Sequence, residues 1–130
     1  MNDEPVIETI ADGLRLQVGT LPPGTASTLL RDETAAYVVG FAVGVSRALD
    51  VPIGNHTVRS LERGCRQGLP SDGDLGQRLA DVATRLLMMN HFGDPTLEGR
   101  KDTGEAEGRA FVEDRTPPSG LRDLLDATAG

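Results

Sequence analysis

The sequence contains very few cysteines and aromatic residues. Its single cysteine, Cys65, excludes an internal disulfide. Tryptophan is absent, and one tyrosine and three phenylalanines are the only aromatic residues. Because bases and sugars are commonly held by stacking on aromatic rings, this scarcity argues against a nucleic-acid or carbohydrate site. The core must therefore be built from Leu, Val, Ala, Ile and Met.

Long apolar runs and positive charge are also scarce. The two longest uncharged runs, residues 16–30 and 34–46, have fifteen and thirteen residues, whereas a membrane-spanning helix needs roughly 20. The N-terminus is acidic and polar, unlike a signal peptide, so we expect a cytoplasmic protein. A formal net charge of −7 disfavours nucleic acid and anionic membranes as partners. Lys101 is the only lysine among thirteen cations, which with abundant Ala and Gly is typical of a GC-rich bacterial or phage genome.

What remains is the composition of one globular domain. The 130 residues are 38% hydrophobic and 25% charged, and a chain of this length can bury a core. We therefore expect residues 1–130 to form a single domain in four parts. These parts are a hairpin with a Pro-rich connector (1–24), a helical core (25–93), an acidic extended segment (94–118) and a short C-terminal helix (119–130).

The first part predicts a short N-terminal β-hairpin. Two apolar runs, residues 6–10 and 14–18, flank an Asp-Gly pair at 12–13. Such a pair between alternating residues favours a hairpin because both residues tolerate positive φ. One face of the second strand would carry Leu14, Leu16 and Val18.

The helical core predicts three helices. Residues 25–50 are apolar nearly all round beyond Glu33, which indicates a buried central helix. Residues 55–69 give a second helix, and Ser71 caps a third. The third helix carries an apolar stripe at helical spacing, made of Leu75, Leu79, Val82, Leu86 and Met89.

The remaining parts differ sharply in composition. Residues 94–118 hold seven acids and four bases with few large apolar residues, which predicts an extended segment. Residues 119–130 form a short amphipathic helix. The fold class is therefore mainly α, with three to four helices around a buried central helix and the N-terminal hairpin packed against them.

A ridge of small residues lies along the central helix. Ala36, Gly40, Gly44 and Ala48 recur at every fourth position and share one helix face. Because each interior glycine costs about 1 kcal/mol relative to alanine, the ridge predicts close approach of another helix. That helix belongs either to the same chain, which we favour, or to a second copy.

A non-enzymatic protein-binding or regulatory module, self-associating as a homodimer, is the function that fits this sequence best. No cofactor is expected, and no metal site either, since Cys65 and the two histidines lack ligand spacing. The residues expected to contact a partner come from the ridge and the C-terminal helix: Gly40, Gly44, Leu121, Leu124 and Leu125.

A DNA-binding regulator is the first alternative. Residues 47–69 have the rhythm of a helix-turn-helix, and Arg59, Arg63 and Arg66 could contact phosphates or guanine edges. The connection is longer than the usual turn of about 3–4 residues, and the net charge opposes DNA. A solvated arginine face on an amphipathic helix explains the same residues.

A small enzyme is the second alternative. His91 and Asp94 are close enough in sequence for a histidine–carboxylate pair, which orients the imidazole in general base catalysis. A histidine near a helix C-terminus is equally explained by its interaction with the negative end of the helix dipole.

Overall fold

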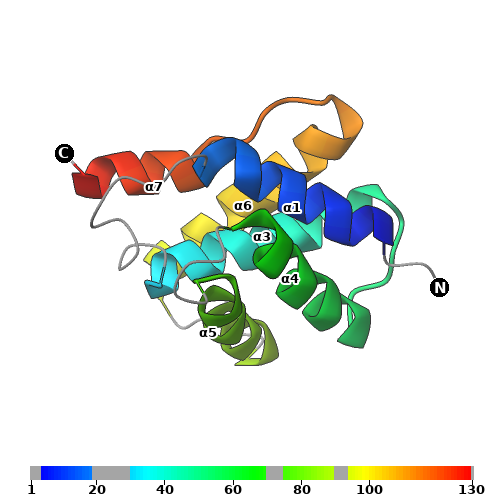
Figure 1. The fold of residues 1–130 in the computed structure, drawn as a ribbon, viewed down its shortest axis with the longest axis horizontal. Helices are drawn as coiled ribbons and strands as arrows, with labels where there is room; N and C mark the ends of the chain where they lie inside the picture. The colour runs from blue at the N-terminus through cyan, green and yellow to red at the C-terminus, as the bar shows by residue number, and fades with distance from the viewer. Residues whose placement is uncertain (1–3, 19–29, 70–74, 90–93, 130) are drawn as a thin grey trace.

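Six α-helices form the part of the chain that the structure describes (Figure 1). The structure is a computed structural model and describes residues 4–18, 30–69, 75–89 and 94–129. The helices are α1 (Glu4–Val18), α3 (Asp32–Ala48), α4 (Asn55–Gly68), α5 (Leu75–Met89), α6 (Pro95–Glu113) and α7 (Gly120–Ala129). None of the helices in these ranges combines the length and hydrophobicity needed to cross a membrane. The mainly α prediction is confirmed, but the expected number of three to four helices is wrong, because the described ranges hold six.

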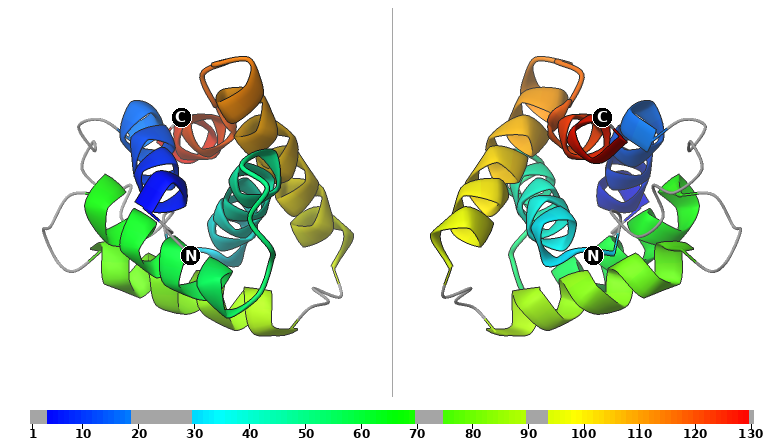
Figure 2. Two further views of the ribbon diagram at one scale, coloured as in Figure 1. Left: turned by 90° about the vertical axis from the view of Figure 1, so that its right-hand side faces the viewer. Right: turned by 90° about the vertical axis from the view of Figure 1, so that its left-hand side faces the viewer.

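Helix α3 lies at the centre and contacts each of the other five helices. In Figure 2, α4 and α5 lie side by side beneath it, α1 and α6 flank it, and α7 lies between α1 and α6. Residues 34–46 of α3 are all buried. The uncharged run at residues 34–46 therefore lies in the core of the fold, and the prediction of a buried central helix is confirmed.

The predicted N-terminal β-hairpin is wrong, because these residues form helix α1 and the described ranges contain no strand. Leu16, which the hairpin placed on one face with Leu14, is 57% exposed, whereas Leu14 is fully buried. Gly13 lies in mid-helix, and a Cβ there would come within 2.7 Å of Phe41 Cε2. The Asp-Gly pair therefore marks a close packing contact of a helix. The buried stripe of α1 has helical spacing: Val6, Ile7, Ile10, Ala11, Leu14 and Val18.

The extended segment predicted for residues 94–118 is also wrong over most of its length, because residues 95–113 form α6. Asp94 caps this helix, its Oδ1 accepting a hydrogen bond of 2.7 Å from the Thr96 N–H. Pro95 occupies the first helical position, where its missing N–H costs nothing. The shortage of large apolar residues in α6 reflects how it packs on α3.

Glycines face glycines where α3 and α6 meet. A Cβ added to Gly40 or Gly44 would overlap the backbone carbonyl of Lys101 or Glu105 in α6. On the α6 side, a Cβ added to Gly104 would overlap the Tyr37 carbonyl of α3. A Cβ added to Gly108 would lie 2.5 Å from the Phe41 carbonyl oxygen. The two backbones are thus in direct contact. The close packing predicted for the small-residue ridge is present, and it is internal to the chain.

Helices α4 and α5 lie where the apolar spacing predicted helices, with α4 ending one residue before the expected 55–69 and α5 described over Leu75–Met89. In α5, Leu75, Leu79 and Leu86 are buried and Val82 is partly buried against the core. The side chain of Met89, like the predicted cap Ser71, falls outside the described residues.

A polar cluster, which we define as the buried Gln17 and Tyr37 and the partly buried Glu107, joins four helices. The Tyr37 hydroxyl, fully buried, donates to Glu107 Oε1 at 2.6 Å and accepts from Gln17 Nε2 at 3.1 Å. Glu107 Oε1 also accepts from the backbone N–H groups of Ser119 and Gly120, both at 2.9 Å. Gln17 Oε1 accepts from the backbone N–H of Leu121 at 2.8 Å. Side chains of α1 and α6 therefore cap α7, satisfying N–H groups that have no partner within that helix.

Candidate functional site

A row of three exposed arginines lies on α4. Arg59, Arg63 and Arg66 are all exposed. Their spacing of four and three residues places them on one side of the helix. We call this set the arginine face.

The opposite side of α4 is anchored in the fold. Leu61 and Cys65 are fully buried. Gly64 packs against α1, where an added Cβ would lie 2.5 Å from Ile10 Cγ2. Gly76 of α5 packs against α4, and its Cβ would lie 2.7 Å from the Cys65 carbonyl oxygen. The helix is therefore held from behind by α1 and α5, and the arginine face is presented on a rigid support.

The three guanidinium groups differ in their partners. Arg66 is paired with Glu62, the only acid in α4. Arg59 lies 3.4 Å from the Nδ1 atom of His56. Arg63 has neither a hydrogen bond nor an ion pair within the described ranges. Two of the three arginines are thus not neutralised by a carboxylate there and can meet an external anion.

The connection between α3 and α4 differs from a tight helix-turn-helix turn. It spans residues 49–54 and contains Asp50 at a φ of 60°. At its end, the Gly54 N–H donates to the Thr57 hydroxyl at 3.0 Å, which starts α4. The helix before this connection is the buried centre of the fold, so only α4 of the pair offers a surface to a nucleic acid.

The two surfaces that the sequence nominated for a protein partner lie inside the fold. Gly40 and Gly44 are covered by α6. Leu121 is fully buried and Leu124 is 8% exposed, while the side chain of Leu125 falls outside the described residues. A partner could reach the first four of these residues only by displacing a helix.

The residues nominated for catalysis are not brought together by any described contact. His91 lies outside the described residues, and Asp94 is engaged as the N-cap of α6. A catalytic role for His91 stays a prediction. Burial raises the pKa of Cys65 to about 12, so its thiol is held in the unreactive protonated form. Among the described residues, no group of three metal-ligating side chains occurs.

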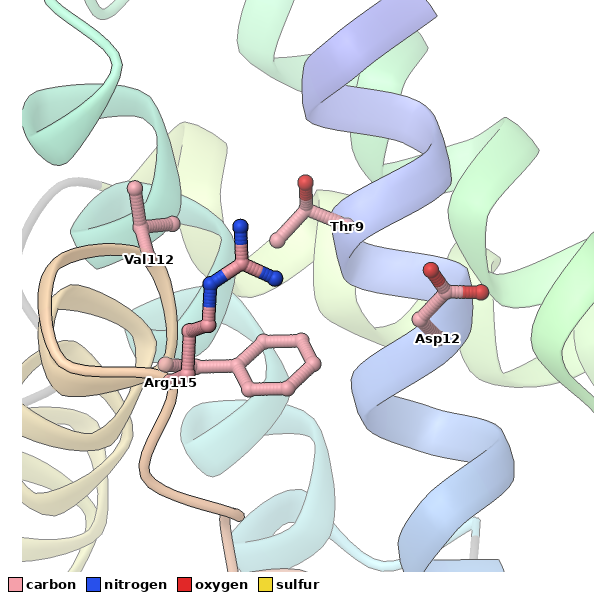
Figure 3. Close-up of a pocket in the computed structure, with 5 residues that line it drawn as sticks. Thr9, Asp12, Val112 and Arg115 are labelled. Atoms are coloured by element: carbon pink, nitrogen blue, oxygen red, sulfur yellow. The ribbon is translucent and has the colours of Figure 1, made fainter.

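A cavity of about 280 Å³ lies between α1 and the C-terminal end of α6 (Figure 3). Its lining consists of Thr9, Asp12, Phe111, Val112 and Arg115. Sequence reasoning missed this cavity because it predicted a hairpin and an extended segment in place of the two helices that form its walls.

Comparisons with protein-family models, curated proteins and solved structures give no match. A function must therefore be argued from the arrangement of the residues themselves.

Proposed function

We propose that this protein is a non-enzymatic, cytoplasmic binding module that holds an acidic segment of a partner protein on the arginine face of α4. The observation that carries the proposal is the exposed row Arg59, Arg63 and Arg66 on a helix anchored from behind. Arginine forms strong, bidentate hydrogen bonds with carboxylates. A partner with matched carboxylates is therefore the chemical complement of this face.

The spacing of the arginine face suits an extended peptide. Arg59 and Arg66 are seven residues apart, about 10 Å along the helix axis. Alternate residues of an extended strand are about 6.6 Å apart, close to the axial rise of about 6 Å between Arg59 and Arg63. A partner segment with acids at alternate positions would thus offer successive carboxylates to neighbouring arginines.

Duplex DNA is the second candidate, favoured by the exposure of the same three arginines on a single helix face. Its difficulty is the surrounding charge. Helix α1, which packs directly beside α4, exposes Glu8, and the chain as a whole carries a formal net charge of −7. A duplex extends well past a 10 Å row and would meet more of this negative charge than a short peptide does.

Fluorescence anisotropy separates the two candidates. The probes are a labelled 12-residue peptide of alternating Glu and Ser, its Gln counterpart, and a labelled 20-base-pair duplex, each at low and high salt. We expect the Glu peptide to bind most tightly, with affinity falling at least tenfold in the R59A/R63A double variant. The matched control is Arg122→Ala, which removes an exposed arginine from α7 and should leave binding unchanged.

Other outcomes assign the function differently. Tighter binding of the duplex, lost in R59A/R63A, would move the function to DNA binding. Equal binding of the Gln peptide, or no binding of any probe at low salt, would overturn the arginine face as a site. Homodimerisation stays a prediction that light scattering tests. A dimer that R59A/R63A dissociates would identify the acidic partner as a second copy of this chain.

A further inference from the structure

The cavity between α1 and α6 has the features of a ligand site that is separate from the arginine face. Its volume of about 280 Å³ is near the lower end of the range for small-molecule pockets, about 300–1,000 Å³. Phe111 and Val112, both partly buried, provide apolar wall. The Phe111 ring is fixed by packing on Phe41, with ring centroids 6.1 Å apart. The apolar wall is therefore part of the core and already formed.

The backbone at Arg115 is unusual for this residue. At the end of α6, the Asp114 and Thr116 N–H groups both donate to the Ala110 carbonyl, at 2.8 and 3.2 Å. This geometry places Arg115 in the left-handed region, at a φ of 56°. Glycine is the usual residue at this position of a helix end, and a residue with a Cβ is strained there. An arginine therefore stands where glycine would be more stable.

The Arg115 side chain is directed into the cavity. Figure 3 shows its guanidinium between the side chains of Thr9 and Val112. Within the described chain, the guanidinium has no ion pair and no hydrogen bond. The nearby acid on the α1 wall, Asp12, is already paired with Arg15 at 2.8 Å.

The hydroxyl on the α1 wall completes the polar lining. Thr9 donates its proton to the Pro5 carbonyl at 2.6 Å, so its oxygen can only accept a further hydrogen bond. The cavity thus combines one cation without an ion pair in the described chain, an apolar wall, and the Asp12 carboxylate paired with Arg15, while the Thr9 oxygen makes no contact with a ligand's carboxylate. We propose that it binds a small monocarboxylate with an apolar body, whose carboxylate pairs with Arg115 and whose hydrocarbon part lies on Phe111 and Val112. This inference goes beyond the proposed function and does not depend on it.

Titration of the ¹⁵N-labelled protein with benzoate and hexanoate, followed by amide chemical shifts, tests the site. One bidentate ion pair and a small apolar contact predict a Kd on the order of 1 mM. Benzyl alcohol and hexanol, which lack the charge, should bind at least tenfold more weakly. Amides of residues 9–12 and 111–116 should shift most.

The decisive variant is Arg115→Gly, because glycine suits the backbone and should keep or raise the melting temperature. We expect it to lose carboxylate binding at least tenfold while remaining folded. The control is Arg109→Ala, which removes an α6 arginine that faces Glu113 and does not line the cavity. Benzoate binding that survives Arg115→Gly, equal binding of the alcohols, or no shifts at tens of millimolar would each overturn the proposal. Acidic-peptide binding by Arg115→Gly should be unchanged, which separates this site from the arginine face.

Discussion

Replacing Gly44 by alanine tests the backbone contact between α3 and α6. The added Cβ would overlap the Glu105 carbonyl, which belongs to a helix backbone and cannot rotate away like a side chain. The helices must therefore separate, and overpacking of this kind typically costs about 1–3 kcal/mol. Gly99 of α6 provides the matched control, because a Cβ there meets no atom within 4 Å.

The comparison isolates the strain because both substitutions gain about 1 kcal/mol of helix propensity. We expect Gly99→Ala to raise the free energy of unfolding by about 1 kcal/mol, and Gly44→Ala to lie about 1–3 kcal/mol below it. An unfolding entropy of about 2.1 cal/mol/K per residue converts 1 kcal/mol into about 4 °C for this 130-residue chain.

Thermal and urea unfolding, followed by circular dichroism at 222 nm, give both values. Gly44→Leu belongs in the same experiment, and it should lower stability further without changing the mass measured by light scattering, because the contact is internal. If Gly44→Ala proves as stable as Gly99→Ala, α3 and α6 are not in backbone contact and the reasoning is refuted. A change in oligomeric state would instead place the ridge at an interface between copies.

Three other substitutions probe the core and its buried titratable groups. Leu79→Ala should lower the free energy of unfolding in urea by about 2–5 kcal/mol, whereas Met88→Ala, at a 75% exposed side chain, should change it by less than about 0.5 kcal/mol. Tyr37→Phe removes the hydroxyl that Gln17 and Glu107 share and should cost about 1–3 kcal/mol at neutral pH. Burial and the Glu107 carboxylate raise the pKa of Tyr37 in the folded state, as burial does for Cys65. The stability linked to these protonated groups is complete below their unfolded pKa values and is lost as the pH rises. The free energy of unfolding should therefore begin to fall above about pH 9 and should fall more steeply with pH above about pH 10. Equal stability at pH 8 and 11 would contradict this.

The sequence predicted the helices whose apolar residues are large and regularly spaced. Leu75, Leu79, Val82 and Leu86 repeat every three or four residues, and this period is sufficient to place α5. Residues 34–46 lack charge, which is sufficient to place α3 at the centre. In both helices, the hydrophobic or uncharged side chains of the helix itself indicate that it is buried.

The errors arose where glycine serves packing rather than a turn. Gly13 was taken as half of a hairpin turn, but it lies in α1 against Phe41. Gly104 and Gly108 lowered the apparent hydrophobicity of α6, but they let its backbone reach that of α3. Local sequence cannot distinguish these uses, because the deciding neighbour is tens of residues away. The cavity at Arg115 could not be anticipated for the same reason, since both of its walls were assigned to other structures.

The way α7 is capped has a consequence for the order of events during synthesis. The Gln17 side chain emerges from the ribosome with the first described helix, but the Leu121 N–H that it accepts from lies 104 residues later. Until then, Gln17 Oε1 has only the Tyr37 hydroxyl, 3.4 Å away, or water as a donor. The caps that Gln17 and Glu107 provide for α7 therefore cannot form while translation is still upstream of that helix. On the ribosome, the earlier helices should remain hydrated at that end, and amide exchange there should slow only after the last helix has docked.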